Sequence, residues 1–121
     1  TNLTKLPENI GKCKKLVALW AVDSYLTRLP ESITELSKLL ELRLNGNKIR
    51  QLPANLGNMK DLLSLWVYKN ELVELPNSIG NLKKMLKISA FNNHITALPS
   101  SITNLNLLQF LIIHNNEIVS L

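Results

Sequence analysis

The stretch that decides the fold reads LLELRLNGNKI and covers residues 39–49. Within it, apolar Leu42 and Leu44 alternate with charged neighbours, which is the period-two pattern of a short strand with one buried face. Asn47 follows where the strand must bend, and Leu52-Pro53 opens the next segment. The stretch therefore predicts a strand, a bend and a turn within about fifteen residues.

The same stretch recurs along the whole chain with a period of 23 residues. The five prolines mark the period: Pro7, Pro30, Pro53, Pro76 and Pro99. This spacing divides the 121 residues into five repeats, 3–25, 26–48, 49–71, 72–94 and 95–117, with a stub at 118–121. Fixed periods of this size are typical of solenoids, so we expect one domain over residues 1–121.

Seven positions within each repeat are apolar in all five repeats. Numbered from the first residue of a repeat they are positions 1, 4, 8, 11, 14, 17 and 19. In the second repeat they are Leu26, Leu29, Ile33, Leu36, Leu39, Leu42 and Leu44. The spacing of three between positions 8, 11 and 14 predicts a 3₁₀ or short helical return. No repeat buries its apolar face alone, so neighbouring repeats must stack.

These residues resemble the leucine-rich repeat family, in its plain 23-residue LPxxIGxLxxL form. The resemblance covers essentially the whole chain. It implies an α/β fold, a right-handed leucine-rich-repeat solenoid with parallel strands on a concave face and short helical or 3₁₀ turns on the convex face. Similar repeats occur in Ras-pathway and Scribble-type scaffolds, in plant intracellular proteins and in bacterial proteins that meet host cells.

An asparagine follows the strand in four of the five repeats: Asn47, Asn70, Asn93 and Asn116. A buried amide donates and accepts hydrogen bonds at once, so stacked asparagines can satisfy backbone groups at each bend. We interpret these residues as a structural spine. The first repeat has the shorter Ser24 at this position and is the least regular.

The exposed positions of the strands carry the candidate binding site. All six aromatic residues lie outside the apolar columns. Strand alternation directs most of them to the concave face, where Arg43 is expected to stack between Trp20 and Trp66. Tryptophan, tyrosine and arginine are enriched at interface hot spots. The predicted protein-binding residues are Trp20, Arg43, Trp66, Tyr68, Lys69, Phe91, Phe110, Ile112 and His114. The alternative is a surface stack with a structural role only.

Composition and motifs narrow the function classes. The chain is 45% hydrophobic with 26 leucines, which excludes disorder. We expect no enzyme, cofactor or metal site, because phosphate-loop and nucleophile motifs are absent and two histidines make a poor metal site. The net charge of +5 comes largely from lysines on the convex return. Aromatic residues do not alternate with these lysines, as they do in surfaces that bind nucleic acids, so we expect no nucleic-acid partner. No apolar run is long enough to span a membrane.

Three further features leave alternatives open. Cys13 replaces a core leucine, and we expect a buried thiol there. Position 15 is apolar in four repeats, which suggests partial burial or an edge for self-association; the apolar last repeat offers a second such surface. With one cysteine and no recognisable signal peptide, the chain does not resemble cysteine-capped extracellular animal members. A cytoplasmic protein and a bacterial secreted or surface protein both remain open.

The sequence therefore favours a protein–protein interaction module that binds a partner protein through its concave strand face. The alternative is a bacterial secreted or surface factor that binds a host cell protein.

Overall fold

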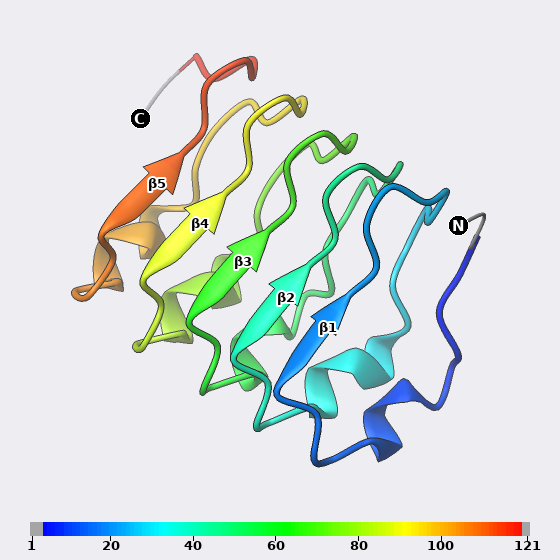
Figure 1. The fold of residues 1–121 in the computed structure, drawn as a ribbon. Coiled ribbons are helices and arrows are strands. Elements are labelled where there is room, and N and C mark those ends of the chain that lie inside the picture. The colour runs from blue at the N-terminus through cyan, green and yellow to red at the C-terminus, as the bar shows by residue number, and fades with distance from the viewer. Residues whose placement is uncertain (1–3, 120–121) are drawn as a thin grey trace.

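The strands form one open parallel sheet in the computed structural model, which describes residues 4–119 (Figure 1). The five strands follow chain order: β1 (Ala18–Trp20), β2 (Glu41–Arg43), β3 (Ser64–Trp66), β4 (Lys87–Ser89) and β5 (Phe110–Ile112). Leu19 pairs with Leu42, and Leu42 pairs with Leu65, so each partner lies one 23-residue repeat further along. The period of the sequence therefore sets the register of the sheet.

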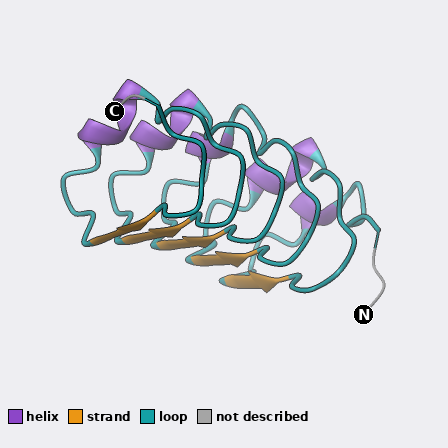
Figure 2. Cartoon of the chain, turned by 90° about the horizontal axis from the view of Figure 1, so that it is seen from above, coloured by secondary structure: helices purple, strands orange, loops and turns teal. Residues whose placement is uncertain are grey.

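Short 3₁₀ helices form the layer opposite the strands (Figure 2). They are η1 (Ile10–Lys12), η2 (Glu31–Glu35), η3 (Leu56–Asn58), η4 (Asn77–Asn81) and η5 (Ser100–Asn104). Each follows a proline whose carbonyl accepts a hydrogen bond from the backbone N–H three residues on, as Pro30 does from Ile33 at 3.1 Å. The fixed φ of proline suits this entry to a turn. The predicted solenoid of strands and 3₁₀ turns is confirmed.

The core lies between these two layers and consists of the apolar columns. Leu42, Leu65 and Ile88, the central residues of β2, β3 and β4, are fully buried. Burying such a side chain contributes about 1.5–3 kcal/mol relative to leaving it exposed. Each 23-residue repeat forms one coil of the solenoid, numbered here in chain order. The matching Leu19 and Leu111 of the first and last strands are only half-buried, because within the described residues each has a neighbouring coil on one side only.

The prediction for Cys13 is wrong. Its thiol is exposed, although position 11 is buried in all four later repeats. The column rule assumes a coil on both sides, and the described part of the chain has none on the N-terminal side of the first coil.

Each strand is only three residues long, because the backbone turns sharply after it. Interstrand hydrogen bonds continue for a few residues, for example from Ala21 N to Arg43 O at 2.9 Å. The residue at position 21 then adopts a positive φ in every repeat: Asp23 (49°), Gly46 (77°), Lys69 (57°), Asn92 (58°) and Asn115 (55°). Glycine, asparagine and aspartate tolerate this left-handed conformation, whereas lysine rarely adopts it.

The four asparagines lie directly after this turn and bridge adjacent coils. Asn70 accepts a hydrogen bond from Ile49 N at 3.1 Å and donates to Leu44 O and Val67 O, both at 3.0 Å. Asn47, Asn93 and Asn116 repeat this pattern one coil apart. Each amide therefore satisfies backbone groups that the bend removes from the strand ladder.

A serine–glycine contact joins coils on the side of the 3₁₀ helices. Ser78 Oγ donates to Ala54 O at 2.7 Å and accepts from Gly57 N at 2.9 Å. A Cβ atom at Gly57 would collide with the carbonyl of Ser78, so the close approach needs glycine there. The same contact joins Ser32 to Gly11, and these contacts fix the spacing of the coils on that side.

Candidate functional site

The first cluster on the strand face is a stack of alternating rings and cations. The parallel register places Trp20, Arg43 and Trp66 side by side on β1, β2 and β3. The Arg43 guanidinium carbon lies 4.1 Å from the centroid of the Trp20 ring and 4.0 Å from that of Trp66. Lys87 Nζ lies 4.1 Å from the Trp66 centroid, so this ring contacts two cations. Such contacts are attractive because the ring face carries negative potential.

Glu41 fixes the orientation of this stack. Its Oε1 accepts a hydrogen bond from Trp20 Nε1 at 2.7 Å, and its Oε2 accepts from Arg43 Nη2 at 3.1 Å. Burial by itself would raise the pKa of this carboxyl, but the hydrogen bonds from Arg43 and Trp20 and the guanidinium charge hold the pKa below its ordinary value. Glu41 is therefore ionised whenever the stack is assembled at neutral pH.

The second cluster is a ladder of three parallel rings at position 20. The Tyr68 and Phe91 centroids are 4.5 Å apart with planes inclined by 7°, and the Phe91 and His114 centroids are 4.8 Å apart with planes inclined by 10°. Trp66 lies 6.4 Å from Tyr68, centroid to centroid, and links this ladder to the first stack. The two clusters together form one aromatic surface across the sheet, which we call the aromatic strip: Trp20, Arg43, Trp66, Tyr68, Phe91 and His114.

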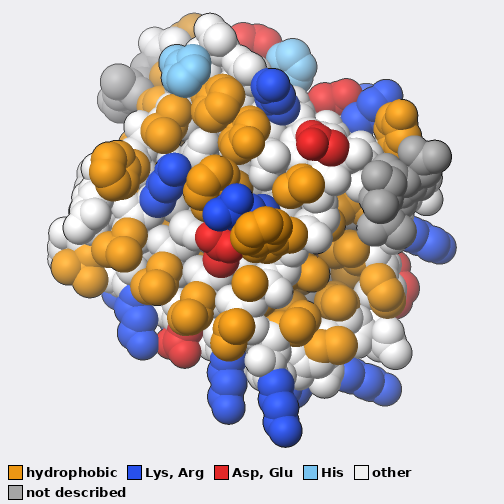
Figure 3. Space-filling view, viewed as in Figure 1, with side chains coloured by type: hydrophobic (Ala, Val, Ile, Leu, Met, Phe, Trp, Pro, Cys, Tyr) orange, Lys and Arg blue, Asp and Glu red, His pale blue; other side chains and the backbone are white. Residues whose placement is uncertain are grey.

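The remaining predicted residues lie beside the aromatic strip. Phe110 is 56% exposed and pairs across the sheet with Lys87, and Ile112 is half-buried beside Ser89. Lys69 is exposed at the left-handed turn that follows Tyr68. In the space-filling view, apolar side chains spread over this face with basic side chains among them (Figure 3).

Sequence reasoning missed Glu41 and Lys87 as members of the site. Both occupy position 16, and strand alternation places them on the same face as position 18. That signal was available, since Glu41 precedes Arg43 by two residues. Which long side chain leans toward which ring depends on rotamers, and the alternation pattern does not specify these.

Comparison with known proteins identifies the family of the chain. No model of a protein family matches it, and no curated protein matches its sequence. Among solved structures, a leucine-rich-repeat protein of Leptospira interrogans is 38% identical and superposes with a TM-score of 0.95 over 97% of this chain. The chain is a leucine-rich-repeat protein.

Two other leucine-rich-repeat neighbours share the fold. A plant peptide hormone receptor, RGFR1, solved in complex with RGF2, is 28% identical and has a TM-score of 0.86 over 93% of this chain. An internalin of Listeria monocytogenes is 20% identical with a TM-score of 0.85 over 97%, which shows the fold alone. The chain spans 30% of the Leptospira protein, 19% of the receptor and 33% of the internalin.

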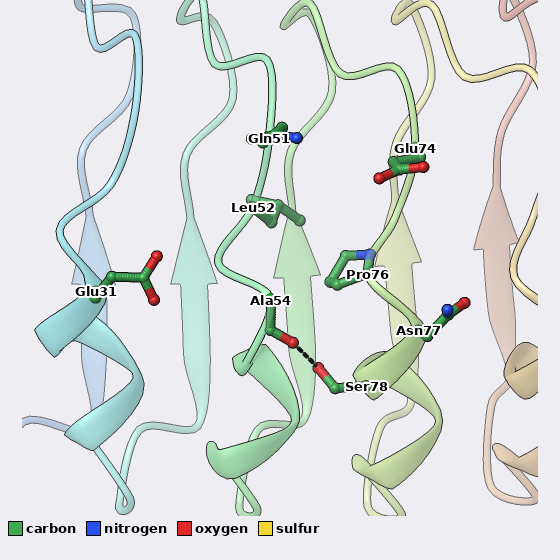
Figure 4. A pocket seen from close by; sticks show the side chains of 8 residues that line it. All are labelled: Glu31, Gln51, Leu52, Ala54, Glu74, Pro76, Asn77 and Ser78. Carbon is green, nitrogen blue, oxygen red and sulfur yellow. Dashed lines mark hydrogen bonds between the residues drawn. The ribbon is translucent and has the colours of Figure 1, made fainter.

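The helical side of this leucine-rich-repeat protein carries polar grooves that lie between its coils. A groove of about 380 Å³ lies between successive coils and is lined by Glu31, Gln51, Leu52, Ala54, Glu74, Pro76, Asn77 and Ser78 (Figure 4). A second groove of about 350 Å³ shares Glu31, Gln51 and Leu52 with it. The grooves repeat with the coils, and the only hydrogen bond drawn among the lining residues is the Ser78–Ala54 contact that joins two coils.

The two histidines lie in different contacts. His94 Nδ1 lies 2.8 Å from Glu117 Oε2, whereas His114 stacks on Phe91. Within residues 4–119, no three histidine, cysteine, aspartate or glutamate side chains gather as a metal site would require. The helices of the same residues are at most five residues long, far too short to cross a membrane.

The apolar column at position 15 is graded along the sheet. Val17 is 54% exposed and Leu40 is 40% exposed, while Leu63 and Leu86 are half-buried. Partial burial therefore holds for the middle of the column. At its N-terminal end the column adds apolar surface beside β1.

Proposed function

We propose that residues 1–121 act as one protein-binding domain of five repeats, whose concave strand face contacts the partner. The observation that carries this proposal is the aromatic strip. Among the described residues, the buried apolar core consists of aliphatic side chains and two methionines without any aromatic one, so the rings are not needed for packing there. Trp20 and Phe110 are 60% and 56% exposed, and contiguous exposed apolar surface usually marks a binding site.

The side chains of the aromatic strip are also ordered before any partner binds. Arg43 is held by two rings and by Glu41. Phe91 is held by a ring on each face. Ordering a flexible side chain on binding costs roughly 0.5–1.5 kcal/mol, and a preorganised surface avoids much of this cost. The receptor neighbour, solved with a bound peptide hormone, supports binding as the use of this fold.

A pull-down from cell lysate tests the proposal. The variant Trp20→Ala/Trp66→Ala/Tyr68→Ala removes the rings that link both clusters, and the variant Lys14→Ala/Lys38→Ala/Lys60→Ala is the matched control on the helical side. We expect partner proteins to be lost with the first variant only, since a hot-spot residue is worth at least about 2 kcal/mol, roughly 30-fold in affinity. Thermal unfolding verifies that both variants fold. Partners retained by a folded ring variant would refute the proposal.

A second candidate function rests on the similarity to the Leptospira interrogans protein. We infer a bacterial secreted or surface factor that binds a host cell protein as the alternative use of the same face. Pull-downs from animal and from bacterial lysates distinguish the two. Ring-dependent partners found only in the bacterial lysate would contradict the host-binding alternative.

A further inference from the structure

The charges on the strand face are distributed unevenly along the solenoid. Coils 1 and 2 carry Asp23, Glu41 and Arg43 on the strands and the bends that follow. The corresponding segments of coils 3, 4 and 5, residues 64–70, 87–93 and 110–116, contain Lys69 and Lys87 but no aspartate or glutamate. The face of the last three coils is therefore aromatic and cationic.

Three carboxylates of coils 3 and 5 are already paired with cations of the same chain. Asp61 lies 2.9 Å from Lys84, and Glu117 lies 2.8 Å from His94. Glu71 lies 3.6 Å from Arg50. Among residues 4–119, no carboxylate pairs with Lys69 or Lys87. The charge of Lys69, and that of Lys87 on the Trp66 ring, is therefore not neutralised by a carboxylate of these residues and can meet charge supplied by a partner.

The rings of the aromatic strip, like the two lysines, favour a partner that carries negative charge. Both faces of Phe91 are covered, by Tyr68 and by His114, and Trp66 contacts Arg43 and Lys87. Stacking of a nucleobase needs an open ring face. What Phe91 leaves open is its ring edge, which carries positive potential and attracts electron-rich groups.

We propose that the strand face of coils 3 to 5 binds an acidic segment of a partner protein, with carboxylates at Lys69 and Lys87 and apolar side chains on Phe110 and Ile112. The inference rests on the proposed function and adds the chemistry of the partner. Charge complementarity carries it, since opposite charges placed across an interface set both its specificity and its association rate. Register places Phe110 beside Lys87 and Ile112 on the same strand, so apolar and charged contacts alternate within a few ångströms.

Selection from a displayed library of random 12-residue peptides tests this inference. The targets are the wild type, Lys69→Glu/Lys87→Glu, and the control Lys38→Glu/Lys60→Glu, which makes the same charge change at exposed lysines on the helical side. We expect the wild type and the control to enrich peptides rich in aspartate and glutamate that also carry apolar residues. The strand-face variant should lose this preference and enrich neutral or basic peptides.

Binding of an enriched peptide is then measured by fluorescence anisotropy. We expect Lys69→Glu/Lys87→Glu to weaken it at least about tenfold and the control variant less than about twofold, with the difference shrinking at high salt. A 12-residue oligothymidylate is the competing probe. Tighter binding of this probe than of the peptide would refute the inference.

Two outcomes separate the inference from the proposed function. Peptides that need Phe110 and Trp66 but show no acidic preference would refute the inference and leave the binding face intact. Peptides that bind Trp66→Ala/Phe110→Ala as tightly as the wild type would contradict both. A library that yields no peptide dependent on the strand face would refute a linear acidic segment as the partner.

Discussion

Substitution of Asn70 by alanine should cost about 2–5 kcal/mol of stability. Asn70 is buried at 6% exposure and makes hydrogen bonds with Ile49 N, Leu44 O and Val67 O, and a longer one with Tyr68 O at 3.3 Å. The two carbonyls each accept a second asparagine, at 2.9 Å from Asn47 and at 3.1 Å from Asn93, so neither loses its last partner. The N–H of Ile49 does lose its only side-chain partner inside the core.

The magnitude follows from these contacts. An orphaned buried N–H costs about 1–3 kcal/mol, and each of the two carbonyl bonds adds roughly 0.5–1 kcal/mol. Asn116 is the matched control, because it makes the same three bonds in the last coil, where it is only half-buried. Water can replace an exposed bond, so we expect Asn116→Ala to cost about 1 kcal/mol or less.

Urea unfolding followed by circular dichroism measures both variants. The midpoint and slope are compared with those of the wild type, because a changed slope would indicate that the coils no longer unfold together. Equal losses for Asn70→Ala and Asn116→Ala, or a loss below about 1 kcal/mol for Asn70→Ala, would show that the asparagines do not act as buried bridges.

Three further predictions concern the bend, the stack and the helical side. Lys69→Asn should raise stability by roughly 0.5–1 kcal/mol, because asparagine tolerates the left-handed φ of 57° that strains lysine; a lower melting temperature would contradict this. Glu41 has a lowered pKa, so its stabilising effect is present above its ordinary pKa of about 4.5 and is lost as the pH falls below that value. The stability gap between wild type and Glu41→Gln, followed by urea unfolding, should therefore narrow as the pH is lowered below about 4.5; a gap that stays constant would rule this out. Gly57→Ala should destabilise by about 1–3 kcal/mol through the collision with the backbone carbonyl of Ser78, and Ser78→Gly/Gly57→Ala should recover none of the loss, because that carbonyl remains; recovery in the same assay would contradict this.

Much of the fold follows from the sequence because a solenoid repeats one local solution. The 23-residue period sets the register of the sheet, so the sequence alone predicts Leu19 and Leu65 as the neighbours of Leu42. The exposed Cys13 shows where this reasoning ends: a column predicts burial only for a coil that has neighbours on both sides. The left-handed turn was also missed, although Gly46, Asn92 and Asn115 at one position signal a positive φ.

The site was less predictable than the fold, since its geometry depends on side-chain rotamers. The register sufficed to place Arg43 between two tryptophans, because three equivalent positions lie on adjacent strands. It did not specify that Lys87 would reach from position 16 to the Trp66 ring, or that Glu41 would accept a bond from Trp20. Each of these contacts is diagonal across the sheet and depends on the length and torsion of both side chains.

The stack around Arg43 can be structural and functional at once, because the same contacts can stabilise the fold and form a binding surface. A purely structural stack should bury its rings, and this one leaves Trp20 60% exposed. A purely functional surface should leave its charges unpaired, and here Glu41 neutralises Arg43 at 3.1 Å. The groups that remain available to a partner differ along the face. Coil 1 offers exposed ring area, and coils 3 to 5 offer ring edges and two ammonium groups that no carboxylate of the described residues pairs with. In the first half of the face Glu41 pairs with Arg43 and Asp23 leaves one negative charge, whereas the second half carries the positive charges of Lys69 and Lys87 for an acidic partner to match.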